Sequence, residues 1–194
     1  MKSKKTLILF FALAMVATAC SSAAVPCDEV EITTGENGLP DLDGCEFTFA
    51  VENAYLPFNY IDAETGEAMG WDYDVFNYMG ELMNFTPVYV PTAWDGMIQA
   101  TADGQFMIAG DGITITAERD EIVDFSNGYI NLAQRVLVAS GNTEITSLQD
   151  LIDGDYTVAT QKGTTNYEFA VSALGEDKVQ AFDDFNFAIQ AVIS

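Results

Sequence analysis

The chain has 194 residues, of which 30 are acidic and 7 are basic, and it contains no histidine. Its hydrophobic fraction of 49% and charged fraction of 19% are typical of a folded globular protein and exclude an intrinsically disordered chain. The formal net charge of −23 argues against partners such as nucleic acid or an anionic membrane surface and favours cationic ones.

The N-terminus has the pattern of an export signal. A basic start, MKSKK, precedes an apolar run at residues 7–19 that is too short to span a membrane. The letters ATAC resemble the end of a bacterial lipoprotein signal, in which the cysteine becomes the lipidated N-terminus, although Ala17 stands where leucine is usual. We therefore expect a signal peptide at residues 1–19 and lipidation of Cys20.

Ordinary secretion, with cleavage near Ala19 or Ala24, is the alternative. Removal of residues 1–19 takes away three lysines and no acidic residue, so the net charge falls from −23 to −26. Export would place Cys27 and Cys45 in an oxidising compartment, where they can form a disulfide; two free thiols are the alternative. The sequence has no CxxC motif and no cluster of His and Cys, so neither a metal nor another cofactor is expected.

Residues 20–45 are expected to form a polar tether and a lead-in closed by the Cys27–Cys45 disulfide. After them, strands and helices alternate. In the first part of the chain we expect a strand at 46–52, a short strand and a turn within 58–70, a helix at 71–85, a strand at 86–90, a helix from 94 to 101, a strand at 106–110 and a short helix after Thr116. In the second part we expect strands at 131–140, 155–159 and 178–182 and helices at 147–152, 164–175 and 184–193. This alternation predicts an α/β protein with mostly parallel sheets. Because the last expected helix is apolar and has no polar tail, we also expect a C-terminal truncation.

Arg119 is a candidate anion-binding residue. It lies in the first turn of the helix that Thr116 is expected to cap, and this helix follows a strand. Free N–H groups at a helix N-terminus and a planar guanidinium together suit a carboxylate. The carboxyl ends of strands are also where open α/β sheets bind ligands. The alternative is an ordinary surface salt bridge with Glu118, Asp120 or Glu121.

Two further groups of residues are candidates for a ligand pocket. In QKGTTNYEF, Thr164 and Thr165 gather hydroxyl and amide donors at the start of a helix; the alternative is plain N-capping. Tyr55, Phe58 and Trp71 lie near strand ends and are able to form the apolar wall of a pocket. Each aromatic residue taken singly is more often part of a core.

Five segments, in this order, resemble family 3 of the bacterial solute-binding proteins of ABC importers: VENAYLPFNYID, GWDYDVFNYMGELM, AWDGMIQATADGQF, DGITITAERDEIVDFS and QKGTTNYEF. The resemblance runs from about residue 46 to the end. It implies a two-lobed periplasmic-binding-protein-like (type II) α/β fold, with a nearly complete first lobe at 46–135 and a partial second lobe at 136–194. It also implies a monomer that captures a polar amino acid between its lobes and delivers it to a membrane permease.

The same resemblance implies roles for individual residues. The positions that match the family's ligand-contacting residues are Tyr55, Trp71, Gly112, Thr114, Arg119, Thr164 and Thr165, and Phe58 is expected close to the ligand. Arg119 matches the arginine that grips the α-carboxylate of the ligand. A hinge strand is expected near residues 131–138, whereas the family's aspartate for the ligand ammonium group has its position beyond Ser194.

Glu52 and Asp111 occupy places where the family's side chains reach the distal end of the ligand. Two carboxylates at that end favour a cationic or amide side chain, such as that of arginine, lysine or glutamine. The alternative is that both acids face water or bond to the backbone.

Two other functions compete with transport. One is an extracellular ligand-sensing domain of a receptor. The other is a secreted cyclohexadienyl dehydratase-like enzyme, in which Glu52 and Asp111 would act as general acid and base. The scarcity of basic residues and the absence of a nucleophile–base pair argue against an enzyme. The expected location is the periplasm or the outer face of the cytoplasmic membrane, with a lipid on Cys20 as the anchor.

Overall fold

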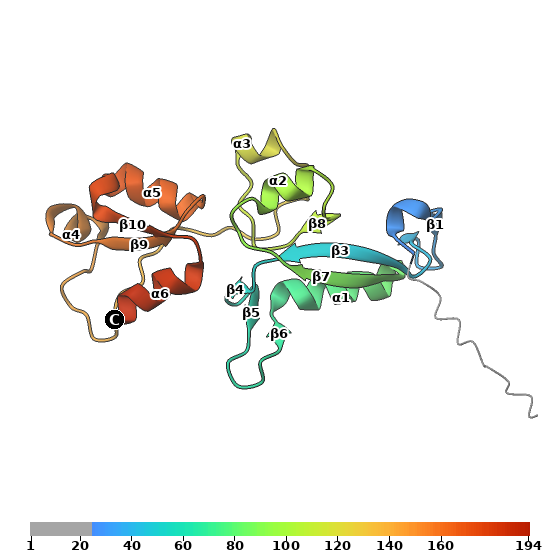
Figure 1. Cartoon of the computed structure of the whole chain (residues 1–194), viewed down its shortest axis with the longest axis horizontal. Coiled ribbons are helices and arrows are strands. Elements are labelled where there is room, and N and C mark those ends of the chain that lie inside the picture. Colours follow the sequence, from blue (N-terminus) through green and yellow to red (C-terminus); the bar gives the residue numbers. More distant parts are fainter. Residues whose placement is uncertain (1–24) are drawn as a thin grey trace, which may run out of the picture.

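The computed structural model describes residues 25–194, so the predicted signal peptide and Cys20 lie outside the described residues. Two α/β units stand side by side and are joined by a long segment without helix or strand (Figure 1). We call the unit from β3 to α3 lobe 1 and the unit from α4 to α6 lobe 2. The prediction of an α/β protein with parallel sheets is confirmed.

Lobe 1 is built around a parallel sheet with strand order β7-β3-β8 and a small antiparallel sheet with order β4-β5-β6. Its elements are β3 (Cys45–Val51), β4 (Ala54–Tyr55), β5 (Asn59–Ile61), β6 (Ala68–Met69), α1 (Trp71–Met83), β7 (Phe85–Pro91), α2 (Met97–Ala102), β8 (Ile108–Ala109) and α3 (Ala117–Asp120). Because β3 and β8 run parallel, their carboxyl ends meet at one edge. The chain that follows each of these two strands therefore emerges at the same place.

The core of lobe 1 lies on both faces of β3. Side chains alternate along a strand, so neighbouring residues enter different layers. Phe49 is fully buried and stacks on Phe76 of α1, with ring centroids 4.2 Å apart. Ala50 is also fully buried and belongs to a second apolar cluster with Trp94 and Met97. Helices α1 and α2 cover these opposite faces of the sheet (Figure 1).

Lobe 2 is smaller and follows the same plan. It contains α4 (Leu148–Asp153), β9 (Val158–Gln161), α5 (Thr165–Leu174), a 3-10 turn η2 (Glu176–Lys178), β10 (Val179–Phe182) and α6 (Phe185–Ile193). Strands β9 and β10 are parallel. The side chains of Ser147, Thr164 and Asp184 cap the three α-helices. No helix within residues 25–194 is long and apolar enough to cross a bilayer.

Three predicted elements differ from the structure. One is the strand expected at 155–159, which instead runs from Val158 to Gln161. The strand expected at 131–140 is wrong, because this segment contains no strand. Extended backbone becomes a strand only beside a hydrogen-bonded neighbour, and no described strand pairs with these residues. The helix expected from residue 94 begins only at Met97, because Gly96 before it has a φ of 84° and cannot continue a helix. Trp94 is therefore a loop residue. The predicted lobe boundary at 135/136 falls in the irregular segment between α3 and α4.

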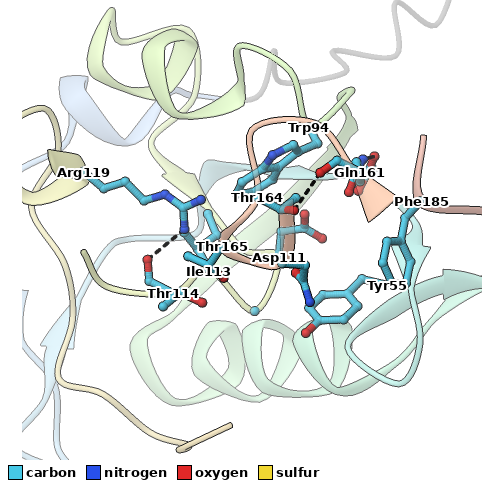
Figure 2. A pocket seen from close by; sticks show the side chains of 13 residues that line it. Tyr55, Trp94, Asp111, Ile113, Thr114, Arg119, Gln161, Thr164, Thr165 and Phe185 are labelled. Carbon is cyan, nitrogen blue, oxygen red and sulfur yellow. Dashed lines mark hydrogen bonds between the residues drawn. The ribbon is translucent and has the colours of Figure 1, made fainter. Parts of the chain in front are cut away.

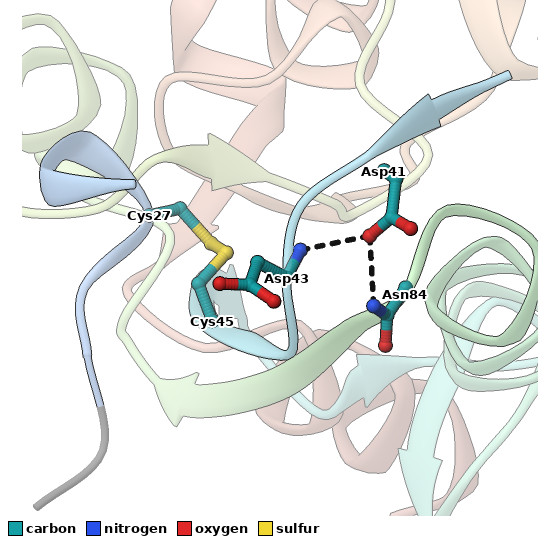
Figure 3. Close-up of a disulfide and its surroundings, with 5 residues drawn as sticks. All are labelled: Cys27, Asp41, Asp43, Cys45 and Asn84. Atoms are coloured by element: carbon teal, nitrogen blue, oxygen red, sulfur yellow. Dashed lines mark hydrogen bonds between the residues drawn. A yellow bond between two sulfur atoms is a disulfide. The ribbon is translucent and has the colours of Figure 1, made fainter. Parts of the chain in front are cut away.

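The lead-in is attached to the end of lobe 1 that lies away from lobe 2 (Figure 1). It contains η1 (Cys27–Glu29), β1 (Thr33–Thr34) and β2 (Pro40–Asp41). A disulfide joins Cys27 to Cys45 at the start of β3 (Figure 3). The Asp41 carboxylate accepts hydrogen bonds from the Asp43 backbone N–H and from the side-chain amide of Asn84, which ends α1. Cys27 and Leu42 of the lead-in are buried in the same apolar cluster as Phe49, so the lead-in contributes to the core of lobe 1.

Removing the disulfide should destabilise the protein strongly. Both sulfurs lie in the buried cluster around Phe49, and the bridge closes a loop with a sequence separation of 18 residues. We expect Cys27→Ala/Cys45→Ala to lower the free energy of unfolding by about 3 kcal/mol, measured by urea denaturation. Dithiothreitol should lower the stability of the parent and leave that of the double variant unchanged. An equal effect of the reductant on both proteins would contradict this expectation.

Candidate functional site

A cavity of about 50 Å³ lies where the two lobes meet (Figure 2). Its lining comes from lobe 1, including the loop after β8, and from lobe 2. The lining residues are Glu52, Tyr55, Trp94, Asp111, Gly112, Ile113, Thr114, Arg119, Gln161, Thr164, Thr165, Asn166 and Phe185. The volume has room for a few water molecules but not for a metabolite.

Arg119 lies at one end of this cavity. Thr116 caps the single turn of α3 by accepting a hydrogen bond from the Arg119 backbone N–H. The Arg119 guanidinium donates to the carbonyl oxygens of Thr114 (2.9 Å) and Gly163 (3.2 Å) and lies over the ring of Trp94. Arg119 forms no ion pair with any residue in the described part of the chain. The structure therefore does not contain the alternative of a surface salt bridge. The charges of Glu168 and Glu118 act on Arg119 without an ion-pair contact.

A cluster of buried polar groups lies at the other end. Asn59 is fully buried, and its side-chain amide donates to Asp72 (2.7 Å) and to Asp111 (2.6 Å). Its side-chain oxygen accepts from the backbone N–H of Asn53 (2.7 Å). Asp72 is 1% exposed and Asp111 is 5% exposed. One neutral amide therefore holds two buried carboxylates, and the Asp111 carboxylate faces the cavity (Figure 2).

Glu52 adds a third acid to this end. It follows β3, beside Asp111 after β8, and its carboxylate accepts a 2.6 Å hydrogen bond from the side chain of Gln161 in lobe 2. Two other contacts join the lobes here. The Trp94 indole N–H donates to the carbonyl oxygen of Gly163 (3.2 Å), and the Tyr55 ring meets the ring of Phe185. These three contacts hold lobe 1 and lobe 2 together beside the cavity.

The three acids carry raised pKa values. Burial raises the pKa of Asp111 to about 7, and the charges of Glu52 and Asp72 add to this effect, while the hydrogen bond from Asn59 opposes it. Burial likewise raises the pKa of Glu52 and of Asp72. No described cation contacts any of the three. Among residues 25–194 there is also no group of three His, Cys, Asp or Glu side chains able to hold a metal ion.

This titration predicts a pH-dependent stability. An unfolded chain ionises Asp111 near pH 4, whereas the folded protein keeps it protonated until about pH 7, so the free energy of unfolding should fall as pH rises from 4 to 7. Asp111→Asn keeps an acceptor for Asn59 and removes the titration. In urea denaturation between pH 4.5 and 7.5, the variant should gain stability relative to the parent as pH rises. A constant difference across this range would show that Asp111 does not titrate there.

Two predicted aromatic residues are not part of the cavity lining. Phe58 is buried and packs against Tyr55, with ring centroids 5.0 Å apart, so it supports the wall from behind. Trp71, at the start of α1, stacks on Tyr129 at 4.6 Å and is half exposed. Tyr129 belongs to the segment between the lobes, and no sequence signal indicated that it would cover Trp71. Of the three predicted aromatics, the structure brings only Tyr55 to the cavity.

Gly112 and the two threonines are at the cavity. Gly112 has a φ of 55°, and a Cβ atom there would come within 2.9 Å of the Tyr55 ring, so glycine suits this position. The Thr164 hydroxyl accepts from the Tyr167 backbone N–H (3.1 Å) and donates to the Gln161 carbonyl oxygen (2.7 Å). Thr164 therefore caps α5, which was the alternative to a ligand-binding role. Free backbone N–H groups at the start of α5, together with Thr165, are the donors that remain.

Sequence reasoning missed five lining residues: Trp94, Ile113, Gln161, Asn166 and Phe185. The first four lie inside or beside the motifs AWDGM, GITIT and QKGTTN, so each was close to a segment that resembles the family. Trp94 was assigned to the face of a helix, and the other three were given no role. Phe185 opens α6 and had no such signal. Its role depends on how lobe 2 sits against lobe 1.

The sequence of this chain is similar to those of a binding protein and an enzyme. The chain is 30% identical over 138 residues to a probable histidine-binding protein of Neisseria gonorrhoeae, covering 66% of this chain and 51% of that protein. It is 28% identical over 145 residues to the cyclohexadienyl dehydratase of Pseudomonas aeruginosa, covering 74% and 54%. The chain thus spans about half the length of these curated relatives.

A solved structure and a family model agree with these relatives. The crystal structure of the ancestral amino acid-binding protein AncCDT-1, a precursor of cyclohexadienyl dehydratase, superposes with a TM-score of 0.71 at 35% identity, covering 76% of this chain and 65% of that one. This likeness confirms the expected type II periplasmic-binding-protein-like fold. Residues 47–193 match the family model of the bacterial extracellular solute-binding proteins, family 3. The chain therefore belongs to family 3 of the bacterial extracellular solute-binding proteins.

Proposed function

We propose that this chain is the substrate-binding part of an ABC importer and captures an amino acid between its lobes, with the α-carboxylate on Arg119. The observation that carries this proposal is the state of the Arg119 guanidinium. It lies at the cavity, and its only described acceptors are two neutral carbonyl oxygens. A carboxylate would bind there more strongly, because a charge-assisted bidentate pair exceeds a neutral hydrogen bond.

The opposite end of the cavity supports a ligand with a cationic or amide side chain. Glu52 and Asp111 lie there beside the buried Asp72, and their partners are the amides of Gln161 and Asn59. Neutral amides satisfy the hydrogen bonds of these acids but do not compensate their charge. A guanidinium or ammonium group would favour the ionised form of these acids and so lower their raised pKa values, and an amide group would replace an existing amide partner.

Ligand entry requires the lobes to separate. The cavity of about 50 Å³ is too small for an amino acid, and contacts such as Glu52–Gln161 span it. We therefore propose that the closed arrangement opens, admits the ligand and closes again on it. Exchange of protein–protein contacts for protein–ligand contacts would then determine the affinity.

The proposal includes a membrane permease as the partner and a lipid on Cys20 as the anchor on the outer face of the cytoplasmic membrane. The motif ending at Cys20 supports the anchor, and family membership supports the permease. The intact mass of the mature protein, purified from a bacterial host, tests the anchor. A mass without lipid would exclude it.

A thermal-shift screen of the twenty amino acids on the full chain tests amino acid capture. A ligand that binds only the folded state raises the melting temperature by mass action. We expect the largest increase with arginine or lysine, a smaller one with glutamine, and none with glutamate. If no amino acid raises the melting temperature, the proposal fails.

A dehydratase is the second candidate. A buried carboxyl group with a pKa of about 7, such as Asp111, suits a general acid, and one relative has the name cyclohexadienyl dehydratase. However, Arg119 is the only cation among the residues that line the cavity, so an anionic substrate with two carboxylates would find too little positive charge. Turnover of prephenate by the purified chain, abolished by Asp111→Asn, would favour this candidate over capture.

A further inference from the structure

Gln161 makes a hydrogen bond that connects the two lobes inside the cavity. It is the last residue of β9 in lobe 2 and is 3% exposed. Its side-chain nitrogen donates to the Glu52 carboxylate in lobe 1 (2.6 Å) and to the backbone carbonyl oxygen of Asp183 in lobe 2 (3.2 Å). One proton of the Gln161 amide is therefore bonded to lobe 1 and the other to lobe 2.

The backbone of Gln161 is fixed by lobe 2. It pairs with Phe182 in the parallel ladder of β9 and β10, and its carbonyl oxygen accepts from the Thr164 hydroxyl (2.7 Å). With Asp183 holding the side-chain amide as well, the donor that reaches Glu52 is preorganised. Its contact with Glu52 therefore depends on the closure of the lobes rather than on a flexible side chain.

The hydrogen bond between Gln161 and Glu52 affects which ligand charge the site prefers. Gln161 occupies the Glu52 carboxylate with a neutral donor, which leaves the negative charge in place. The side-chain oxygen of Gln161 accepts no hydrogen bond from any residue of the described chain. The basic residue nearest in sequence, Lys162, turns away and pairs with the Asp183 carboxylate (2.7 Å) at the surface. A distal cation of the ligand must therefore share the Glu52 carboxylate with the Gln161 amide, which already occupies one of its two oxygens.

We propose that Gln161 is a specificity-determining residue that weakens the preference of the site for a cationic over a neutral ligand side chain, by occupying Glu52 with an amide. This inference rests on the proposed capture of an amino acid. Two substitutions should move the preference in opposite directions.

Gln161→Met keeps the size of the side chain and removes the donor, so Glu52 becomes free for a ligand cation. Gln161→Lys instead supplies an ammonium group that pairs with Glu52 and neutralises it. The probes are arginine and citrulline, which have nearly the same shape, although only arginine carries a positive side chain. Isothermal titration of the full chain should show the arginine-to-citrulline affinity ratio rise about tenfold with Gln161→Met and fall about tenfold with Gln161→Lys.

Gln180→Met is the matched control, because Gln180 lies exposed on the neighbouring strand β10 and outside the cavity lining. It should leave the ratio unchanged. A merely structural role of Gln161 would weaken both ligands equally, so ratios within twofold of the parent in the Gln161 variants would overturn the inference while the parent still binds. Absence of binding by the parent would overturn the proposed function and this inference together. Melting temperatures measured without ligand show whether each variant folds. If one Gln161 variant does not fold, the affinity ratio of the other variant tests the inference.

Discussion

Arg119→Ala should lower the affinity for the best amino acid of the thermal-shift screen by about 100-fold or more. The substitution removes the only cation of the cavity lining and with it the proposed partner of the ligand carboxylate. Arg119→Lys keeps the charge but not the planar fork that binds two carboxylate oxygens, so it should recover only part of the affinity. Isothermal titration of both variants and the parent measures the effect.

Arg135→Ala is the matched control for this experiment. Arg135 lies exposed in the segment between the lobes and donates only to the carbonyl oxygen of Gln134, so its removal changes the net charge equally without touching the cavity. It should bind the ligand like the parent. Similar losses in Arg119→Ala and Arg135→Ala would mean that net charge, and not a carboxylate contact, determines binding. Unchanged binding in Arg119→Ala would remove Arg119 from the site.

Asn59→Ala should be among the most destabilising single changes in the protein. It removes the hydrogen-bond donors of the buried Asp72 and Asp111 carboxylates and leaves the backbone N–H of Asn53 without its acceptor. Breaking a buried polar network typically costs about 3–5 kcal/mol, because the remaining groups stay buried and unpaired. Urea denaturation at pH 7.5, where the carboxylates are most often ionised, should show a loss of this size.

Asn77→Ala serves as the control for this loss. Asn77 is exposed on α1, and its side-chain oxygen accepts only from the Tyr89 hydroxyl (3.0 Å), so its removal should cost well under half as much. The loss in Asn59→Ala should also become smaller at pH 5, where protonation of Asp111 removes a buried charge. A loss that does not depend on pH would indicate that packing, rather than unpaired charge, makes Asn59 important.

Local patterns in the sequence predicted most of the fold. The apolar strand at 46–52 and the helix at 71–85 appear within one or two residues of their expected bounds. Thr116 caps its helix as expected, and Thr164 caps its helix as the alternative of plain N-capping had it. Each of these features depends on residues within a few positions of one another, so their hydrogen bonds and periodicity can be read from a short segment.

Residue patterns were enough to predict the α/β alternation and to place Arg119 in the first turn of a helix that follows a strand. Tertiary packing, in contrast, places Trp71 on Tyr129 and Trp94 at the cavity, and it leaves residues 131–140 without a partner strand. It also decided that Glu52 meets Gln161, a residue 109 positions away. The physical reason is that such contacts arise from the meeting of the two lobes, and no short-range pattern encodes where a distant surface will lie.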